Sequence, residues 1–150
     1  MVKRNQTDWK ATLPDAMVTL LHEEGGFTWN MSTGCPVTNG VAVAKGKGHC
    51  MTIPLAWLDI DIMRAFVQSL GPIWHCNINR PIGARFHFGG WVQDDIAYLD
   101  VVEVISHKPE DQCLEIALTK GRDRGEFSVY DMTNKREHRC SDGKVVSDDG

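Results

Sequence analysis

The chain has 150 residues, of which 42% are hydrophobic and 24% charged, and this size and composition are typical of one globular domain. No apolar run reaches the roughly 18 residues of a membrane-spanning helix. Residues 1–10 carry some positive charge but no apolar block follows them, so we expect no signal peptide and a cytoplasmic location. A formal charge of −4, spread along the chain, argues against a nucleic-acid partner, because such binding relies on lysine and arginine meeting phosphates.

Two helices are predicted in the first half of the chain from their end signals. The first begins at Pro14, a residue that suits the first helical turn, and Gly25-Gly26 terminates it. The second begins at Pro54 and runs to about Leu70, where Gly71-Pro72 stops it. Apolar residues recur at helical spacing in both segments: Met17, Leu20 and Leu21 in the first, and Leu55, Leu58, Ile62 and Phe66 in the second.

A third helix is predicted to begin near Pro109, with Glu110 and Asp111 in its first turn, where the helix dipole favours negative charge. Gly121 is predicted to end it. Its apolar stripe places Cys113 at a core position, where the thiol acts as a small hydrophobe. The other members of this stripe are Leu114, Ala117 and Leu118.

Strands are predicted between the helices. Residues 27–31 alternate between apolar and polar side chains, as a half-buried strand does. Residues 41–45 and 49–53 flank the glycine-rich turn 46–48, so we expect them to pair as a hairpin.

A second hairpin is predicted farther along the chain, after a long loop at residues 74–84. Residues 84–92 and 96–105 flank Gln93-Asp94-Asp95, which supplies the turn. Because residues 96–105 are apolar on both faces, we expect this strand in the centre of the sheet.

After the third helix, residues 126–132 form a predicted strand from which residues 135–140 return. The order of elements predicts an α+β fold, with one mostly antiparallel sheet and about three helices packed on it. The step from residues 96–105 through the third helix to residues 126–132 is long enough to join two parallel strands. We assign residues 1–138 to this single domain and residues 139–150 to a disordered tail, which has little to bury.

The order of short motifs along the chain resembles that of a known family. The motifs are Gly25-Gly26-Phe27-Thr28, Asn30, Thr33-Gly34, Gly40-Val41-Ala42-Val43, Gly89-Gly90-Trp91, Tyr98-Leu99-Asp100-Val101 and Val129-Tyr130-Asp131-Met132. By this order, roughly residues 14–134 are similar to a family of small uncharacterised proteins from phages of actinobacteria and related mobile elements. The family usually has an aromatic residue where this chain has Val41. The resemblance implies a phage accessory protein in the host-cell cytoplasm, and it brings no catalytic residue.

Segments that could bind a metal or a phosphate have simpler explanations. The pairs His49-Cys50 and His75-Cys76 offer zinc-type ligands, but adjacent strand residues point to opposite faces and the usual paired cysteine spacing is absent. Residues 44–50 contain glycines and lysines but lack the spacing and the helix of a phosphate-binding loop. Asp94-Asp95 is explained by turn chemistry at a hairpin tip. We therefore expect no metal and no other cofactor.

The cysteines are odd in number and irregular in spacing, so we expect free thiols and no disulfide framework. They are Cys35, Cys50, Cys76, Cys113 and Cys140. Any of them could meet a histidine as nucleophile and base, but no local signature selects such a pair. No catalytic residue is therefore predicted, and a non-enzymatic function is favoured.

The predicted binding residues are Thr28, Trp29, Asn30, His87 and Trp91. Trp29 and Trp91 each follow a glycine corner, where a large ring can lie across exposed backbone, and tryptophan is enriched at interaction hot spots. The alternative for each is a ring packed in the core with its N–H satisfied. His87 alternates with two phenylalanines, so we expect it to point away from the core, toward water or a partner. The first segment becomes a binding site only if Thr28, Trp29 and Asn30 are exposed together.

The leading hypothesis is a phage accessory protein that binds a host or phage macromolecule, such as an inhibitor used in host takeover or anti-defence. The alternative is a small enzyme or small-molecule-binding protein with its pocket between residues 25–30 and 87–91. A deep polar pocket holding His87 or a carboxylate beside Thr28 would favour this alternative, and a flat or convex apolar patch would favour macromolecular binding. A third option, nucleic-acid binding, would need these basic residues on one face: Lys3, Arg4, Lys10, Arg80 and Arg85.

Overall fold

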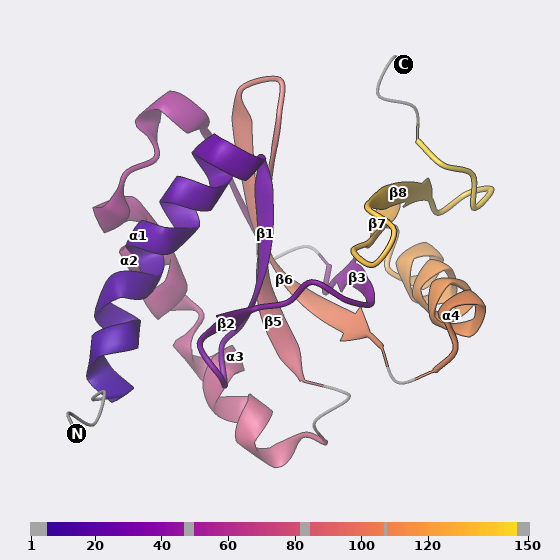
Figure 1. The fold of residues 1–150 in the computed structure, drawn as a ribbon, viewed down its shortest axis with the longest axis horizontal. Helices are drawn as coiled ribbons and strands as arrows, with labels where there is room; N and C mark the ends of the chain where they lie inside the picture. The colour runs from indigo at the N-terminus through magenta and orange to yellow at the C-terminus, as the bar shows by residue number, and fades with distance from the viewer. Residues whose placement is uncertain (1–5, 47–49, 82–84, 107, 147–150) are drawn as a thin grey trace.

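The computed structural model describes the backbone of residues 6–46, 50–81, 85–106 and 108–146, and the side chains within these ranges from residue 14 onward (Figure 1). Its helices are α1 (Gln6–Glu24), α2 (Ile60–Ser69), α3 (Gly71–Cys76) and α4 (Glu110–Asp123), with short 3₁₀ helices η1 (Leu55–Trp57) and η2 (Asn77–Asn79). Its strands are β1 (Gly26–Asn30), β2 (Cys35–Pro36), β3 (Val41–Ala44), β4 (Cys50–Pro54), β5 (Phe86–Gln93), β6 (Ile96–Ile105), β7 (Ser128–Asp131) and β8 (Arg136–Arg139).

The strands form one eight-stranded sheet in which every described pair is antiparallel. The order is β2-β1-β5-β6-β3-β7-β8, and β4 also pairs with β6. β6 lies in the centre, because β5 pairs with one of its edges and β3 and β4 pair with the other. The predicted α+β class and the central place of this strand are therefore confirmed.

The glycine-rich segment after β3 does not form the predicted hairpin. β3 pairs with residues 102–105 of β6, and β4 continues along the same edge, opposite residues 96–100. The Lys45 N–H donates to the Val101 carbonyl at 2.7 Å, so β3 and β4 follow one another along one edge of β6 and do not form a hairpin. The hairpin prediction is wrong because β6 is long enough to pair with two short strands in succession. Residues 47–49 lie outside the described part of the chain.

The β5–β6 hairpin agrees with the sequence prediction. Gln93 pairs with Ile96, which leaves Asp94 and Asp95 as the two turn residues. Their φ angles of 53° and 62° lie in the left-handed region that a two-residue type I′ turn requires. Because neither residue is glycine, this turn is less favourable than the usual Asn-Gly turn.

α4 joins β6 to β7, which run in the same direction with β3 between them and antiparallel to both. β7 then returns into β8 as predicted.

Beyond β8, residues that were assigned to the disordered tail continue against the sheet. Val145 forms a bridge with His138, and the Val146 N–H donates to the Glu137 carbonyl at 2.8 Å. The domain therefore extends to at least Val146, and residues 147–150 lie outside the described part.

Two predicted helix starts are wrong. α1 begins at Gln6 and contains Pro14 in its interior. Proline is costly inside a helix because it lacks an N–H group, but the Pro14 ring is fully buried, which offsets part of that cost. Pro54 is the last residue of β4, and α2 begins after Asp59, whose carboxylate accepts the Ile62 N–H at 2.8 Å.

α2 ends at Ser69, next to the predicted end at Leu70, but the predicted loop after it and the predicted end of the third helix are wrong. Gly71-Pro72 begins α3, so the region from residue 74, predicted as a loop, is helical as far as Asn79. α4 passes through Gly121 and ends at Asp123. A Cβ atom at Gly121 would lie 2.5 Å from Cys140 Sγ, so this glycine permits close packing and does not terminate the helix.

The described helices cover one face of the sheet, which we call the helix face. Odd-numbered residues of β6 point to it, since Leu99 and Val101 belong to the core under α1 and α2, and Ile105 belongs to the core under α4. Strand twist carries α4 to the other side of the molecule from α1 and α2 in Figure 1. Among the described residues, the helices are all too short or too polar to span a membrane.

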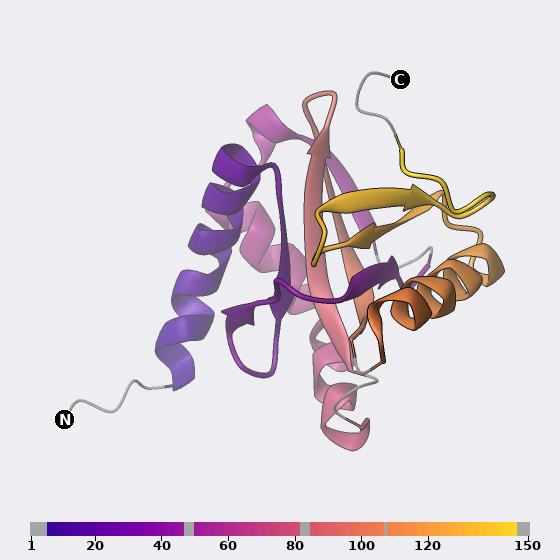
Figure 2. The same ribbon diagram turned by 45° about the vertical axis from the view of Figure 1, so that its right-hand side comes forward.

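Even-numbered residues of β6 point to the opposite face, which we call the open face. The chain between β2 and β3 crosses one end of it, where Val37 packs against a small cluster of Val102, Val104 and Met132. No residue of this cluster comes from a described helix. The other end of the open face lies at the β5–β6 hairpin tip (Figures 1 and 2).

Candidate functional site

Four of the five predicted binding residues point to the open face: Thr28, Asn30, His87 and Trp91. Residues that face each other on neighbouring strands point to the same side of a sheet, so the register arranges these side chains in rows across the strands. Trp29 is the exception, because it alternates with Thr28 and Asn30 along β1 and points to the helix face.

The row nearest the hairpin tip is built around two stacked aromatic rings. It consists of Gly26, Trp91, Tyr98 and Thr52, in register across β1, β5, β6 and β4, and we call it the aromatic row. The Trp91 and Tyr98 rings are 5.3 Å apart and within 7° of parallel, and Trp91 is 42% exposed. A Cβ atom at Gly26 would lie 3.6 Å from Trp91 Cβ, so the glycine leaves that flank of Trp91 uncovered. The row therefore presents a fixed and accessible aromatic surface.

Trp29 does not belong to this surface, and its predicted exposure is wrong. It is 8% exposed and packs in the core with Phe88, its partner on β5. Its Nε1–H has no hydrogen-bond partner among the described residues. The alternative prediction, a ring packed in the core, is correct for the position of Trp29. Its further expectation, that the ring N–H would have a hydrogen-bond partner, is not met among the described residues.

Thr28 and Asn30 point to the open face without forming a joint surface with Trp29. Thr28 is half-buried, and its carbonyl accepts the Val37 N–H at 2.7 Å. The Asn30 side chain accepts the N–H groups of Ser32 and Thr33 at 2.9 and 3.1 Å, so turn chemistry explains it. The condition that all three residues be exposed together is not met.

His87 is buried, which corrects the expectation that it faces water. It is 9% exposed, and its register partner is Val102, at the end of the open face where the β2–β3 connection crosses. Its Nδ1 has no hydrogen-bond partner among the described residues. Burial lowers the pKa of His87, which favours the neutral ring. Alternation identified the face correctly, but it could not show that the side chain is buried there.

Asp100 was missed as a site residue, although it lies between His87 and the aromatic row. It faces Gly89 across β5 and β6, is 5% exposed, and its Oδ1 has no partner among the described residues. Burial, and then the charge of Glu126, raise the pKa of Asp100 well above its usual value. A Cβ atom at Gly89 would lie 3.0 Å from Asp100 Oδ1, so the glycine makes room for the carboxyl group. An acid within a largely apolar strand was the signal that could have identified it.

His87 and Asp100 are diagonal neighbours on β5 and β6, a spacing that lets side chains interact. Their pKa shifts favour a neutral imidazole and a protonated carboxyl group. Perturbed groups of this kind are common at sites of proton transfer. Neither side chain, however, is open to solvent.

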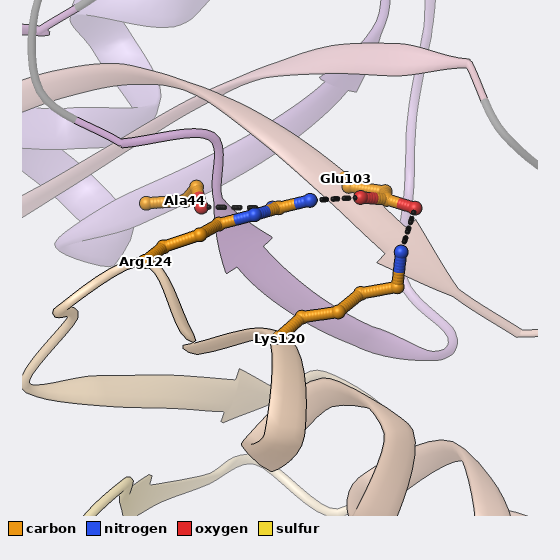
Figure 3. Close-up of polar contacts among 4 residues, drawn as sticks. All are labelled: Ala44, Glu103, Lys120 and Arg124. Carbon is orange, nitrogen blue, oxygen red and sulfur yellow. Dashed lines mark hydrogen bonds and ion pairs between the residues drawn. The ribbon is translucent and has the colours of Figure 1, made fainter. Parts of the chain in front are cut away.

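A second buried acid, Glu103, has a structural role on the helix face (Figure 3). Its carboxylate accepts hydrogen bonds from Arg124 Nη2 at 2.6 Å and Lys120 Nζ at 3.1 Å, and Arg124 Nη1 also donates to the Ala44 carbonyl. Burial alone would raise the pKa of Glu103, but the hydrogen bonds and charges of Arg124 and Lys120 outweigh it and hold the pKa below its usual value. These contacts fasten α4 to the sheet.

Two hollows of the surface lie away from the aromatic row. One, of about 220 Å³, is lined by Asn39, Gly40, Val41, Ser106, Lys108, Glu110, Cys113, Asp131 and Thr133. The other is a shallow groove of about 540 Å³ along α1, lined by Asp15, Ala16, Thr19, Leu20, Trp29 and Pro36. Neither holds His87 or Asp100, so neither is the polar pocket that the enzyme alternative requires.

The candidate metal ligands among the described residues do not form a metal site. Within the described ranges, no three His, Cys, Asp or Glu side chains are grouped so that they could hold a metal ion, and His49 lies outside those ranges. All five cysteines are free thiols, and Cys113 is buried as predicted. Of the basic residues considered for nucleic acid, Lys3, Arg4 and the Lys10 side chain lie outside the described part. Arg80 and Arg85 lie close together, since Arg85 Nε donates to the Arg80 carbonyl at 3.3 Å and Arg80 lies over the Phe86 ring.

Comparisons of the chain with family models, with curated proteins and with solved structures give no match. The resemblance to phage proteins therefore stays a prediction carried by the motifs alone.

Proposed function

We propose that the protein is non-enzymatic and acts by binding a macromolecular partner through the aromatic row. The observation that carries this proposal is the exposed Trp91 ring, stacked flat on Tyr98 on the open face of the sheet. Exposed tryptophan and tyrosine offer a large contact area, and such residues dominate binding at interaction hot spots.

Two features support a macromolecule over a small ligand. The Trp91–Tyr98 stack is fixed before binding, which reduces the entropy lost when a partner docks. The stack also lies outside both hollows, whereas small-molecule sites are concave and enclose most of their ligand. The resemblance to actinobacterial phage proteins adds that the partner is a host or phage macromolecule met in the host cytoplasm.

One observation favours the second candidate, a small enzyme or small-molecule-binding protein. His87 and Asp100 are buried, titratable and diagonal to each other, as an acid–base pair would be. Against this candidate, the space above Gly89 is filled by the Asp100 carboxyl group. We therefore rank it below partner binding.

The proposal is tested with Trp91→Ala, using Phe127→Ala as the matched control because Phe127 is also an exposed aromatic residue, at 65%. Tagged wild-type and variant proteins capture partners from an actinobacterial lysate, and melting temperature is measured in parallel. We expect Trp91→Ala to weaken capture of a partner about thirtyfold or more, as loss of a hot-spot residue does. Phe127→Ala should capture like wild type. Equal capture by both variants would refute partner binding through the aromatic row.

A further inference from the structure

Acidic residues gather at one end of the molecule, although they are spread along the sequence. Residues 14–30, 50–63 and 86–100 contain aspartates and glutamates but neither lysine nor arginine. The fold joins these segments at the hairpin tip, where the Val92 N–H donates to the Gly25 carbonyl and the Leu55 N–H to the Asp95 carbonyl, both at 2.9 Å. Figures 1 and 2 show the last turn of α1, the β5–β6 tip and the chain after β4 at this same end.

Four carboxylates are exposed here: Glu23 and Glu24 in the last turn of α1, and Asp94 and Asp95 at the tip. We call them the acidic tip. Within the described part of the chain, none of the four takes part in an ion pair. The aromatic row adjoins them, since Trp91 is the register partner of Gly26 and lies next to Val92. A second tryptophan, Trp57, is 71% exposed on η1.

Turn chemistry allows aspartate at Asp94 and Asp95, but folding does not require the negative charge of the acidic tip. Glutamates in the last turn of a helix face the negative end of the helix dipole, which is unfavourable. Asp94 and Asp95 are adjacent like charges, and both adopt the left-handed conformation. Each feature lowers stability, so the gathering of negative charge around exposed tryptophan calls for a functional explanation.

We infer that the partner docks a basic, arginine-bearing protein segment on the acidic tip, with Trp91 and Trp57 as the aromatic contacts. The inference rests on the proposed function, because Trp91 belongs to both. An arginine guanidinium stacks on a tryptophan ring and forms paired hydrogen bonds with a carboxylate, so it matches both components of this surface. The same negative charge repels nucleic acid and anionic membranes, and it speeds encounter with a basic partner.

The probe is a fluorescein-labelled nona-arginine peptide, and its binding is measured by fluorescence anisotropy. The acidic tip is neutralised in the variant E23Q/E24Q/D94N/D95N. A control variant, E110Q/D111N/E115Q/D123N, removes four exposed carboxylates from α4, so both variants have the same net charge. We expect the tip variant to bind the peptide about tenfold more weakly than the control variant. Melting temperatures confirm that both variants fold.

Equal weakening in the two variants would show binding to net charge alone and would overturn the inference, as would failure of the wild type to bind. A nona-lysine peptide tests the role of stacking. Wild type should prefer nona-arginine, and Trp91→Ala should lose that preference; a preference that survives would overturn the stacking contact.

The two proposals fail differently. If Trp91→Ala reduces partner capture but neutralising the acidic tip does not weaken nona-arginine binding, the proposed function is supported and the basic partner is refuted. If neutralising the acidic tip weakens nona-arginine binding but Trp91→Ala captures the partner like wild type, the proposed function is refuted.

Discussion

β6 carries two buried acids only three positions apart, one on each face of the sheet, and their surroundings differ. Glu103 on the helix face is held by Lys120 and Arg124 at hydrogen-bond distance. Asp100 on the open face has a carboxylate oxygen with no partner among the described residues. The pKa of Glu103 is lowered and that of Asp100 is raised, although both side chains are about equally buried.

The difference indicates that the two faces serve different purposes. On the helix face, apolar residues and satisfied charges stabilise the fold. On the open face, an unsatisfied acid, a buried histidine and an exposed aromatic stack persist although they add little stability or reduce it. Features that lower stability concentrate at functional surfaces. We therefore expect substitutions on the helix face to lower the stability of the fold, and substitutions on the open face to change it little or to raise it.

A large loss of stability is expected at Leu118 on α4, which is 2% exposed in the core of the helix face. Leu118→Ala should lower the free energy of unfolding by about 2–5 kcal/mol, because it removes buried methyl groups and leaves a cavity. Leu114→Ala is the control, and since Leu114 is only partly buried its loss should be smaller. Denaturant titration measures both, and near-neutral effects at both would contradict the assigned face of α4.

Glu103→Gln should lower the free energy of unfolding by about 1.5–3 kcal/mol at neutral pH, because the hydrogen bonds from Lys120 and Arg124 lose their charged acceptor. The pKa of Glu103 is lowered in the fold, so its contribution is present above the ordinary value of 4.5 and disappears as pH falls through the lower folded pKa. The variant should therefore lose part of the acid dependence of stability. Urea titrations between acid and neutral pH give this difference, and a variant that loses no more at neutral than at acid pH would contradict it.

Asp100→Asn should instead raise the free energy of unfolding, by on the order of 1 kcal/mol at neutral pH. The substitution removes an acid whose charged form is disfavoured by burial. The pKa of Asp100 is raised in the fold, so its ionisation in the unfolded chain lowers stability as pH rises above 3.8. The gain should therefore vanish below that pH. A loss of stability at neutral pH would mean that the Asp100 carboxyl group has partners like those of Glu103.

The parts of the fold that were predictable from sequence are those with local signals. Asp94-Asp95 between two apolar runs predicted the β5–β6 hairpin, and the apolar run of residues 96–105 predicted a central strand. The hairpin predicted at residues 46–48 failed because the pairing partner of β4 lies far along the chain. Pro14 and Pro54 are compatible with a helix start, but the same residues also fit a buried helix interior and a strand end.

The candidate site was also predictable only where local sequence signals determine it. Alternation along β1 already places Trp29 opposite to Thr28 and Asn30, so their joint exposure was excluded by the strand itself. Alternation gives the face to which His87 points, but it cannot show whether that side chain is buried there. The acidic tip could not be predicted either, because its charges come from separate segments that only the tertiary fold brings together.

Trp29 and Trp91, on opposite faces of the same pair of strands, provide the most direct test of the division between the faces. Each is changed to alanine, and melting temperature and partner capture are measured on the same samples. Trp29→Ala should cost about 3–5 kcal/mol of stability, as loss of a buried aromatic ring does. Trp91→Ala should melt like wild type and lose capture of the partner. A collapse of the melt in both variants, or full capture by Trp91→Ala, would contradict the assignment of the open face as the binding surface.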